Sequence, residues 1–173
     1  KLNPGNLPLA SSYKLGNWQF ITENQNPALY QLTNVLTESY QYDRDRLVQV
    51  TDETSGISTV YLWAYNGTHP VAEIRNATFA NVVQSLGGDY MVNQLYNSYT
   101  PNMNVVNNLR NVLINSQVTT MTFKLLVGVT SITDPRGIKT SYEYDSFGNL
   151  KNIRDLNNRL LQTIQVHYIG EYL

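Results

Sequence analysis

The sequence predicts a mainly β protein with a helical insertion (α+β), in which antiparallel β-hairpin repeats form a curved sheet. Three observations predict this fold: 13 Tyr and 21 Asn in 173 residues, turn-forming Asp residues at regular spacing, and helical periodicity confined to about 76–117. Tyr suits half-buried strands, and Asn tolerates the left-handed backbone of tight turns. The length fits one domain, so we expect a single sheet segment over 1–173.

The composition argues against several classes of function. The chain has 12 Lys and Arg against 13 Asp and Glu, and this balance argues against nucleic-acid binding, which needs a basic face. The chain has no Cys, which excludes disulfides, thiolate zinc sites and Cys nucleophiles. No apolar run approaches the roughly 18 residues of a membrane span, so we expect no membrane insertion. No motif predicts a cofactor.

The first part of the chain is predicted to form short strands. Residues 1–34 have only weak alternation, with one strand that turns Trp18 and Phe20 inward and a turn at 24–27. After Leu36 the alternation sharpens, and Asn66-Gly67 ends the most regular strand with a pair of residues typical of short hairpins. We expect strands at 39–43, 47–50, 58–65 and 70–74, with turns at 43–46 and 52–56.

Residues 76–117 have the periodicity of helices. We expect Asn76 to cap a first helix that Gly87-Gly88 ends, Asp89 to cap a second, and Thr100-Pro101 to begin a third. The apolar positions at helical spacing are Phe79, Val82, Val83 and Leu86 in the first helix and Met91, Leu95 and Tyr99 in the second. The third helix should turn Met103, Val106, Leu109 and Leu113 inward.

Strands return after this insertion, at 119–124, 128–133, 139–144, 150–154 and 160–168. The turn between the second and third of these is Asp134-Pro135-Arg136-Gly137, which has the residue preferences of a type I turn followed by a glycine bulge. Asp145 and Gly148 repeat the pattern, and Asp155 repeats it with Asn158 in the place of glycine.

The spacing of these turns indicates an internal repeat. The Asp residues at 134, 145 and 155 are 11 and 10 residues apart, and Asp43 and Asp52 open an earlier copy. The aromatic residue that ends each outgoing strand recurs after 23 residues from Tyr42 to Tyr65 but after 58 from Tyr65 to Phe123. The excess of roughly 35 residues coincides with the helical segment, which is therefore predicted to be an insertion between repeats.

The repeat resembles the YD (RHS-type) repeat. Tyr142–Leu150 is similar to its YxYDxxGxL core, and Thr133–Gly137 to the turn before that core. Tyr40–Leu47 is a second copy, in which Arg46 replaces the usual Gly and predicts a looser turn, and Val60–Asn66 is a third. The resemblance covers about 38–75 and 119–168.

The resemblance implies a structural function. In this family consecutive hairpins stack into a spiralling sheet, which closes into a toxin shell in some members and carries adhesion in others. The chain is therefore expected to be a non-catalytic segment of a larger bacterial protein that is secreted or at the cell surface. Its expected partners are neighbouring repeats of the parent chain.

Aromatic side chains suggest an alternative, a carbohydrate-binding or protein-binding face. The candidates are Trp63, Tyr61, Tyr65, Tyr142 and Tyr144, since the two residues of each Tyr pair should share one face of the sheet. Packing between repeats explains the same residues and is the favoured interpretation.

The turn residues invite a catalytic interpretation that we do not favour. Carboxylates such as Asp43, Asp134, Asp145 and Asp155 drive glycoside hydrolysis when they are paired, but each opens a turn in which its side chain would accept backbone N–H groups. The repeat turns are thus expected to be built by Asp43, Asn66, Gly67, Asp134, Pro135, Gly137, Asp145, Gly148 and Asp155. The lone His69 and His167 match no metal-ligand spacing.

The predicted sheet should have open edges. A run of strands leaves unpaired backbone groups at 1–21 or 160–168, which favours pairing with a second chain. We therefore expect either a homodimer through sheet edges or a helical insertion that covers an edge. The amphipathic stripes at 79–86 and 106–113 should bury against a sheet face or end, the nearest apolar surface.

Overall fold

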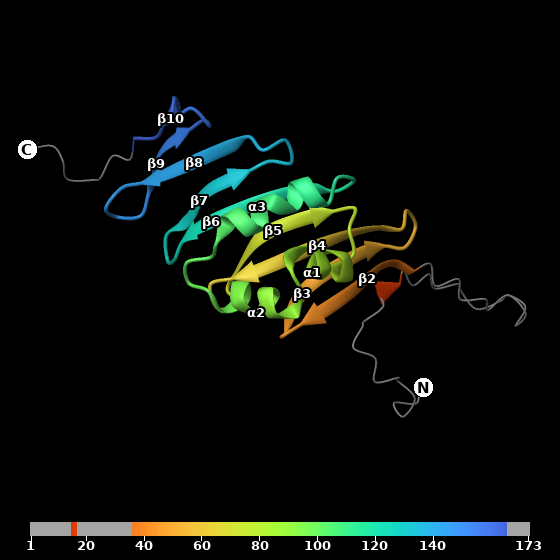
Figure 1. Ribbon diagram of the computed structural model, residues 1–173. Coiled ribbons are helices and arrows are strands. Elements are labelled where there is room, and N and C mark those ends of the chain that lie inside the picture. The colour runs from red at the N-terminus through yellow and green to blue at the C-terminus, as the bar shows by residue number, and fades with distance from the viewer. Residues whose placement is uncertain (1–14, 17–35, 166–173) are drawn as a thin grey trace, which may run out of the picture.

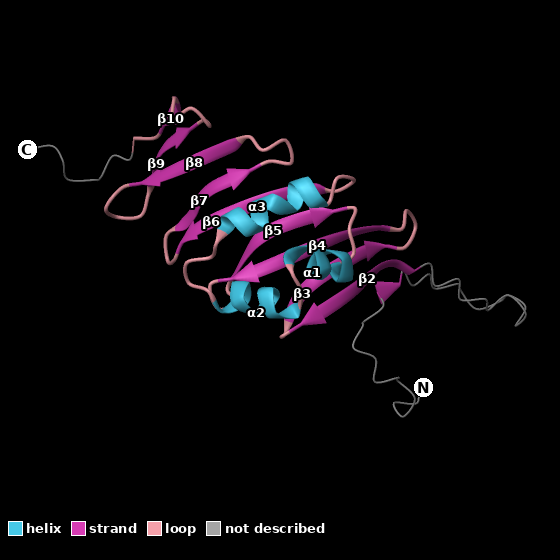
Figure 2. Ribbon diagram, in the orientation of Figure 1, coloured by secondary structure: helices cyan, strands magenta, loops and turns pink. Residues whose placement is uncertain are grey.

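The computed structural model describes residues 15–16 and 36–165, which form one open antiparallel sheet with three helices on one face (Figures 1 and 2). Its ten strands lie in the order of the sequence, each paired with the next, as expected for successive hairpins. The strands are β1 (Leu15–Gly16), β2 (Leu36–Asp43), β3 (Arg46–Asp52), β4 (Ile57–Ala64), β5 (His69–Arg75), β6 (Gln117–Lys124), β7 (Gly128–Thr133), β8 (Lys139–Tyr144), β9 (Leu150–Arg154) and β10 (Leu160–Thr163). The prediction of a mainly β fold with a helical insertion is confirmed.

The three helices all lie between β5 and β6 in the sequence: α1 (Phe79–Leu86), α2 (Asp89–Asn97) and α3 (Met103–Val112). Despite this interruption β5 pairs directly with β6, with Ala72 opposite Thr120. The insertion therefore leaves the sheet continuous and adds a second layer on one face.

The helix caps differ from the expected ones. Thr78, and not Asn76, caps α1, and its hydroxyl accepts from the backbone N–H of Asn81. Asn76 has a left-handed backbone (φ 63°) and donates its amide to the carbonyl of Asn115. Asp89 is the first residue of α2, not its cap.

The end of α1 agrees with the sequence prediction, and the start of α3 differs from it. Gly87 is left-handed (φ 112°) and ends α1, as the sequence predicts. Asn102 caps α3 by accepting from the N–H of Asn104, so Thr100-Pro101 precedes the cap.

The core lies between the helices and the middle of the sheet. Along β4 every second residue is buried, and the same face of β5 and β6 adds Ile74 and Val118. The helices bury Val82, Leu95, Val106 and Leu109 against this face. The amphipathic stripes of the helices are thus buried against a sheet face, one of the two surfaces expected for them, and the insertion covers this face and not an edge.

Two turns in the first half of the sheet differ from expectation. The turn after Asp43 is tight and not loose: only Arg44 and Asp45 separate β2 from β3, and both are left-handed (φ 48° and 58°). At the Asn66-Gly67 hairpin, β4 ends one residue early at Ala64. A four-residue loop, 65–68, then connects β4 to β5.

Some expectations fall outside the described residues. These are most of the segment 1–34, with Trp18, Phe20 and the turn at 24–27, and the end of the predicted strand 160–168 beyond residue 165. Within the described residues β10 ends at Thr163, and all four of its side chains are exposed.

Candidate functional site

Three hairpin turns in the second half of the sheet share one geometry. In each turn a carboxylate oxygen of the first Asp accepts two backbone N–H groups, from the residues two and four positions later. For Asp134 the donors are Arg136 and Ile138, at 3.0 and 2.8 Å. For Asp145 and Asp155 all four corresponding distances are 2.9 Å. The fourth residue of each turn is left-handed: Gly137, Gly148 and Asn158.

These hydrogen bonds stabilise the ionised carboxylates. The N–H of Ile138 and the adjacent Arg136 hold the pKa of Asp134 below its usual value. The N–H of Arg159 and its guanidinium lower the pKa of Asp155 in the same way. Carboxylates that are engaged with their own turns, at low pKa, suit a structural role better than proton transfer.

The turns also separate the carboxylates. The Asp145 turn joins β8 to β9 and lies at the opposite end of the strands from the Asp134 turn, which joins β7 to β8. Asp43 differs from the others, because its carboxylate pairs with the side chain of Arg44. The four Asp residues therefore do not gather in one place in the described sheet: Asp43 and Asp145 lie at one end of the strands, and Asp134 and Asp155 lie at the other.

Four of the five candidate aromatic residues share one face of the sheet. Register places Leu62, Ala72, Thr120 and Thr133 in one row on the helix-covered face. Tyr61 and Trp63 alternate with Leu62 on β4 and therefore project from the other face. Ser141 pairs with Ser131 on the helix side, which puts Tyr142 and Tyr144 on the same face as Trp63.

The two aromatic groups on this face are distant from each other. Four strand spacings separate β4 from β8, or about 19 Å at the usual spacing between strands. Glu73, Met121 and Ile132 lie on the same face between them. A single small ligand cannot contact both groups, but an extended chain can.

Two of these aromatic residues are held by neighbouring hairpins. The indole Nε1 of Trp63 donates to the carbonyl oxygen of Leu47 at 2.8 Å, and the guanidinium of Arg46 lies 5.7 Å from the centre of the Trp63 ring. The hydroxyl of Tyr144 donates to the carbonyl oxygen of Val129 at 2.8 Å. Burial is the main cause that raises the pKa of Tyr61, with a smaller contribution from Glu73.

Tyr65 is buried, unlike the other four candidates. Its side chain is 5% exposed and lies in the core, where its hydroxyl accepts from the backbone N–H of Phe123 at 3.1 Å. The chain leaves the strand after Ala64 and Tyr65 is left-handed (φ 53°), so the regular alternation that would place Tyr61 and Tyr65 on one face does not extend to Tyr65. Tyr65 is therefore unavailable to a ligand.

Sequence reasoning missed Arg110 of α3, which connects the insertion to the sheet. Its guanidinium donates to the carbonyl oxygens of Asp134 and Thr133, at 3.1 and 2.9 Å, and to the hydroxyl of Thr120 at 3.1 Å. Burial lowers its pKa. The signal in the sequence was that Arg110 is the only cation in 76–117.

The described residues show no metal centre. In that part of the chain no three His, Asp or Glu side chains gather as a metal site would require. The His69 ring packs 4.6 Å from the centre of the Phe123 ring, and its Nδ1 lies 2.8 Å from the hydroxyl of Thr68. His167 is outside the described residues. None of the described helices is both long and apolar enough to cross a membrane.

One part of the chain matches a known protein family. Residues 127–163 match the family model described as RHS Repeat. The match begins just before β7 and ends at β10, so it contains all three Asp turns of equal geometry. No curated protein matches the chain.

Proposed function

Since residues 127–163 match the RHS repeat family, we propose that the chain is a non-catalytic structural and interaction segment of a larger bacterial protein, at the cell surface or secreted. Its hairpins would extend the sheet of a scaffold or shell formed with neighbouring repeats. The strand order carries this proposal: the ten strands follow the sequence without a crossover, even across 41 intervening residues between β5 and β6.

The exposed edge strand supports a partner that continues the sheet. The described residues leave one side of β10 without a neighbouring strand, and Leu160 and Leu161 on it are 54% and 61% exposed. An edge with unpaired N–H and C=O groups favours strand addition. In the parent protein the next repeat would occupy this edge, and in the isolated chain a second copy would.

Light scattering tests the use of this edge. We expect the isolated chain to show a concentration-dependent dimer that Leu161→Lys weakens, because a charge on an edge strand opposes pairing. Leu126→Lys is the control, since Leu126 is fully exposed in the turn between β6 and β7, away from β10. A strictly monomeric chain, or equal effects of both variants, would contradict edge pairing.

A substrate screen tests the absence of catalysis. The purified chain should turn over no glycoside, ester or peptide substrate, because the Asp carboxylates of the repeat turns are engaged with their own backbone. Turnover that disappears in Asp134→Asn, a change that keeps an acceptor oxygen in the turn, would contradict the proposal.

Carbohydrate binding is the second candidate function. It is favoured by the four aromatic residues on the face opposite the helices, where all four are half-buried. Aromatic rings in such positions offer flat surfaces for stacking on sugar rings. Glycan-array binding that Tyr142→Ala or Trp63→Ala abolishes in a folded protein, while Tyr99→Ala on the helical side does not, would support it. No binding across the array would exclude it.

A further inference from the structure

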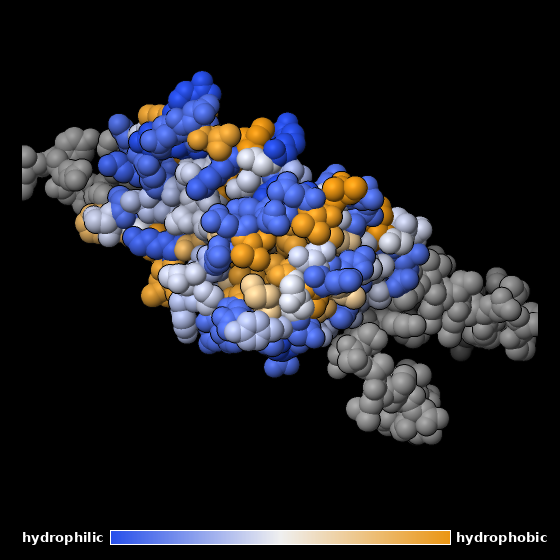
Figure 3. Space-filling view, viewed as in Figure 1, coloured by the Kyte–Doolittle hydropathy of each residue, from blue (hydrophilic) through white to orange (hydrophobic). Residues whose placement is uncertain are grey.

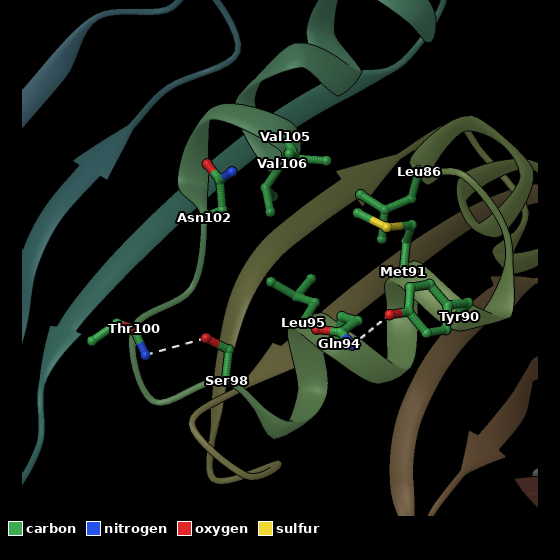
Figure 4. Close-up of a pocket in the computed structure, with 10 residues that line it drawn as sticks. All are labelled: Leu86, Tyr90, Met91, Gln94, Leu95, Ser98, Thr100, Asn102, Val105 and Val106. Atoms are coloured by element: carbon green, nitrogen blue, oxygen red, sulfur yellow. Dashed lines mark hydrogen bonds between the residues drawn. The ribbon is translucent and has the colours of Figure 1, made fainter.

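A groove lies between α2 and α3 on the outer side of the helical layer (Figure 4). Its volume is about 320 Å³, within the range of ligand sites in proteins. The side chains of Leu86, Leu95 and Val106, one from each helix, point into it. Figure 3 shows hydrophobic residues gathered at the centre of this side of the molecule.

The rim of the groove is polar, but it carries no charge. The ten lining residues include no Asp, Glu, Lys, Arg or His. The amide of Gln94 donates to the hydroxyl of Tyr90 at 2.9 Å, which orients an aromatic ring that is 70% exposed. On the other side, the hydroxyl of Ser98 accepts from the N–H of Thr100 at 3.2 Å and keeps its own proton available as a donor.

The surface around the groove is also nearly uncharged. Only Asp89 and Arg110 are charged among the 42 residues from 76 to 117, whereas 14% of the whole chain is charged. Arg110 faces the sheet, where it donates to Thr120 and Thr133. Depletion of charged residues and enrichment of Tyr and Met distinguish the centres of protein interfaces from ordinary surface, and the groove has the exposed Tyr90 beside the half-buried Met91.

We propose that this groove binds an aromatic anchor, a Tyr or Trp side chain of a partner protein. The apolar floor suits the ring, and the hydroxyl and amide groups of the rim suit the single polar group that Tyr and Trp carry at one end. Interface hot spots are typically such side chains, each seated in a pocket and surrounded by weaker neutral contacts. A charged anchor is disfavoured, because nothing in the lining would compensate its desolvation.

Selection from a random peptide library tests the proposal. The full chain is panned against 12-residue peptides displayed on phage, and selected sequences are then synthesised and titrated by fluorescence anisotropy. We expect the selected peptides to share a Trp or Tyr flanked by uncharged residues. Replacement of that aromatic residue by Ala should weaken binding about tenfold or more.

Matched variants locate the binding site. Tyr90→Ala removes the exposed wall of the groove and should weaken binding about tenfold, as a lost hot-spot contact does. Val105→Glu places a charge in the groove and should abolish binding. Tyr99→Ala is the control: Tyr99 is 62% exposed but does not line the groove.

Three outcomes would overturn the proposal. The first is a library that yields no binding peptide, and the second is a set of selected peptides that share a charged or aliphatic residue in place of Trp or Tyr. The third is a loss of binding in Tyr99→Ala as large as that in Tyr90→Ala. Because Tyr90 is 70% exposed, its truncation should leave the chain folded, which the thermal unfolding midpoint checks.

Discussion

The hydroxyl of Tyr144, at the end of β8, donates a hydrogen bond to the carbonyl oxygen of Val129 in the preceding hairpin. The Tyr144 ring passes so close to Gly128 that a Cβ there would lie 2.7 Å from the hydroxyl oxygen. Tyr65 makes the corresponding contact in the other direction, by accepting from the N–H of Phe123 in the next hairpin. The tyrosine of the repeat thus connects adjacent hairpins as well as filling space.

The Tyr144 hydrogen bond should contribute measurably to stability. We expect Tyr144→Phe to lower the free energy of unfolding by about 1 kcal/mol, because the Val129 carbonyl loses its donor while the ring remains. Urea denaturation measures the loss. Tyr142→Phe, on the same strand and face, should cost less, and equal losses in both variants would contradict an inter-hairpin role for Tyr144.

Gly67 should be required for its contact with Tyr96. A Cβ on Gly67 would overlap the Tyr96 ring, whereas Gly56 has open space around it and the same backbone angle, φ 70°. Both Gly→Ala changes strain the backbone equally, so only the overlap distinguishes them. We expect Gly67→Ala to lower the thermal midpoint clearly more than Gly56→Ala, and the second change Tyr96→Ala to reduce that difference. Equal midpoints would contradict this.

The second half of the sheet was predictable because its turns are determined by residues close together in the sequence. The bounds of β7, β8 and β9 agree with the predicted strands, since an Asp that accepts two N–H groups and a left-handed residue three positions later require no distant partner. The helices were predictable for a similar reason, because their apolar spacing is local.

Features that depend on distant contacts were not predictable. Asn76 and Thr78 are both residue types that cap helices, and only the contact of Asn76 with Asn115 decides between them. The face of Tyr65 depends on where β4 ends, and the role of Arg110 depends on acceptors up to 24 residues away. The alternation of apolar residues in a strand does not show where the strand ends, and the composition of a helix does not show which distant groups its side chains contact.

Arg110 should hold the helical layer on the sheet. We expect Arg110→Met to lower the free energy of unfolding by about 2 kcal/mol, because the carbonyls of Thr133 and Asp134 and the Thr120 hydroxyl lose a charged donor. Amide hydrogen exchange should accelerate in α3 first. Arg136→Met is the control, since Arg136 is 79% exposed and its ion pair should contribute little. Similar losses of stability in the two variants would show that Arg110 does not hold the helical layer on the sheet.

The Asp turns should make stability depend on pH in the acid range. The pKa of Asp134 and that of Asp155 are lowered in the folded chain, chiefly by the backbone N–H groups of Ile138 and Arg159. A lowered pKa contributes stability that is complete above the unfolded value, near 3.9, and that is lost as the pH falls through the folded pKa. Urea midpoints between pH 2 and pH 6 should therefore fall less steeply for the double variant Asp134→Asn, Asp155→Asn than for the wild type. Parallel curves would show that these carboxylates do not contribute.

Asn158 should be replaceable by glycine but not by a residue that avoids left-handed backbone. It has φ 62° at the position that Gly137 and Gly148 hold in the two equivalent turns, and its side chain is exposed. We expect Asn158→Gly to keep or slightly raise the free energy of unfolding, and Asn158→Val to lower it by about 1–2 kcal/mol, because a Cβ-branched residue is strained there. Asn157→Val is the control, since Asn157 is also exposed, has no positive φ, and donates its backbone N–H to Asp155. Equal effects of the two Val variants in urea denaturation would mean that the left-handed residue does not determine the turn.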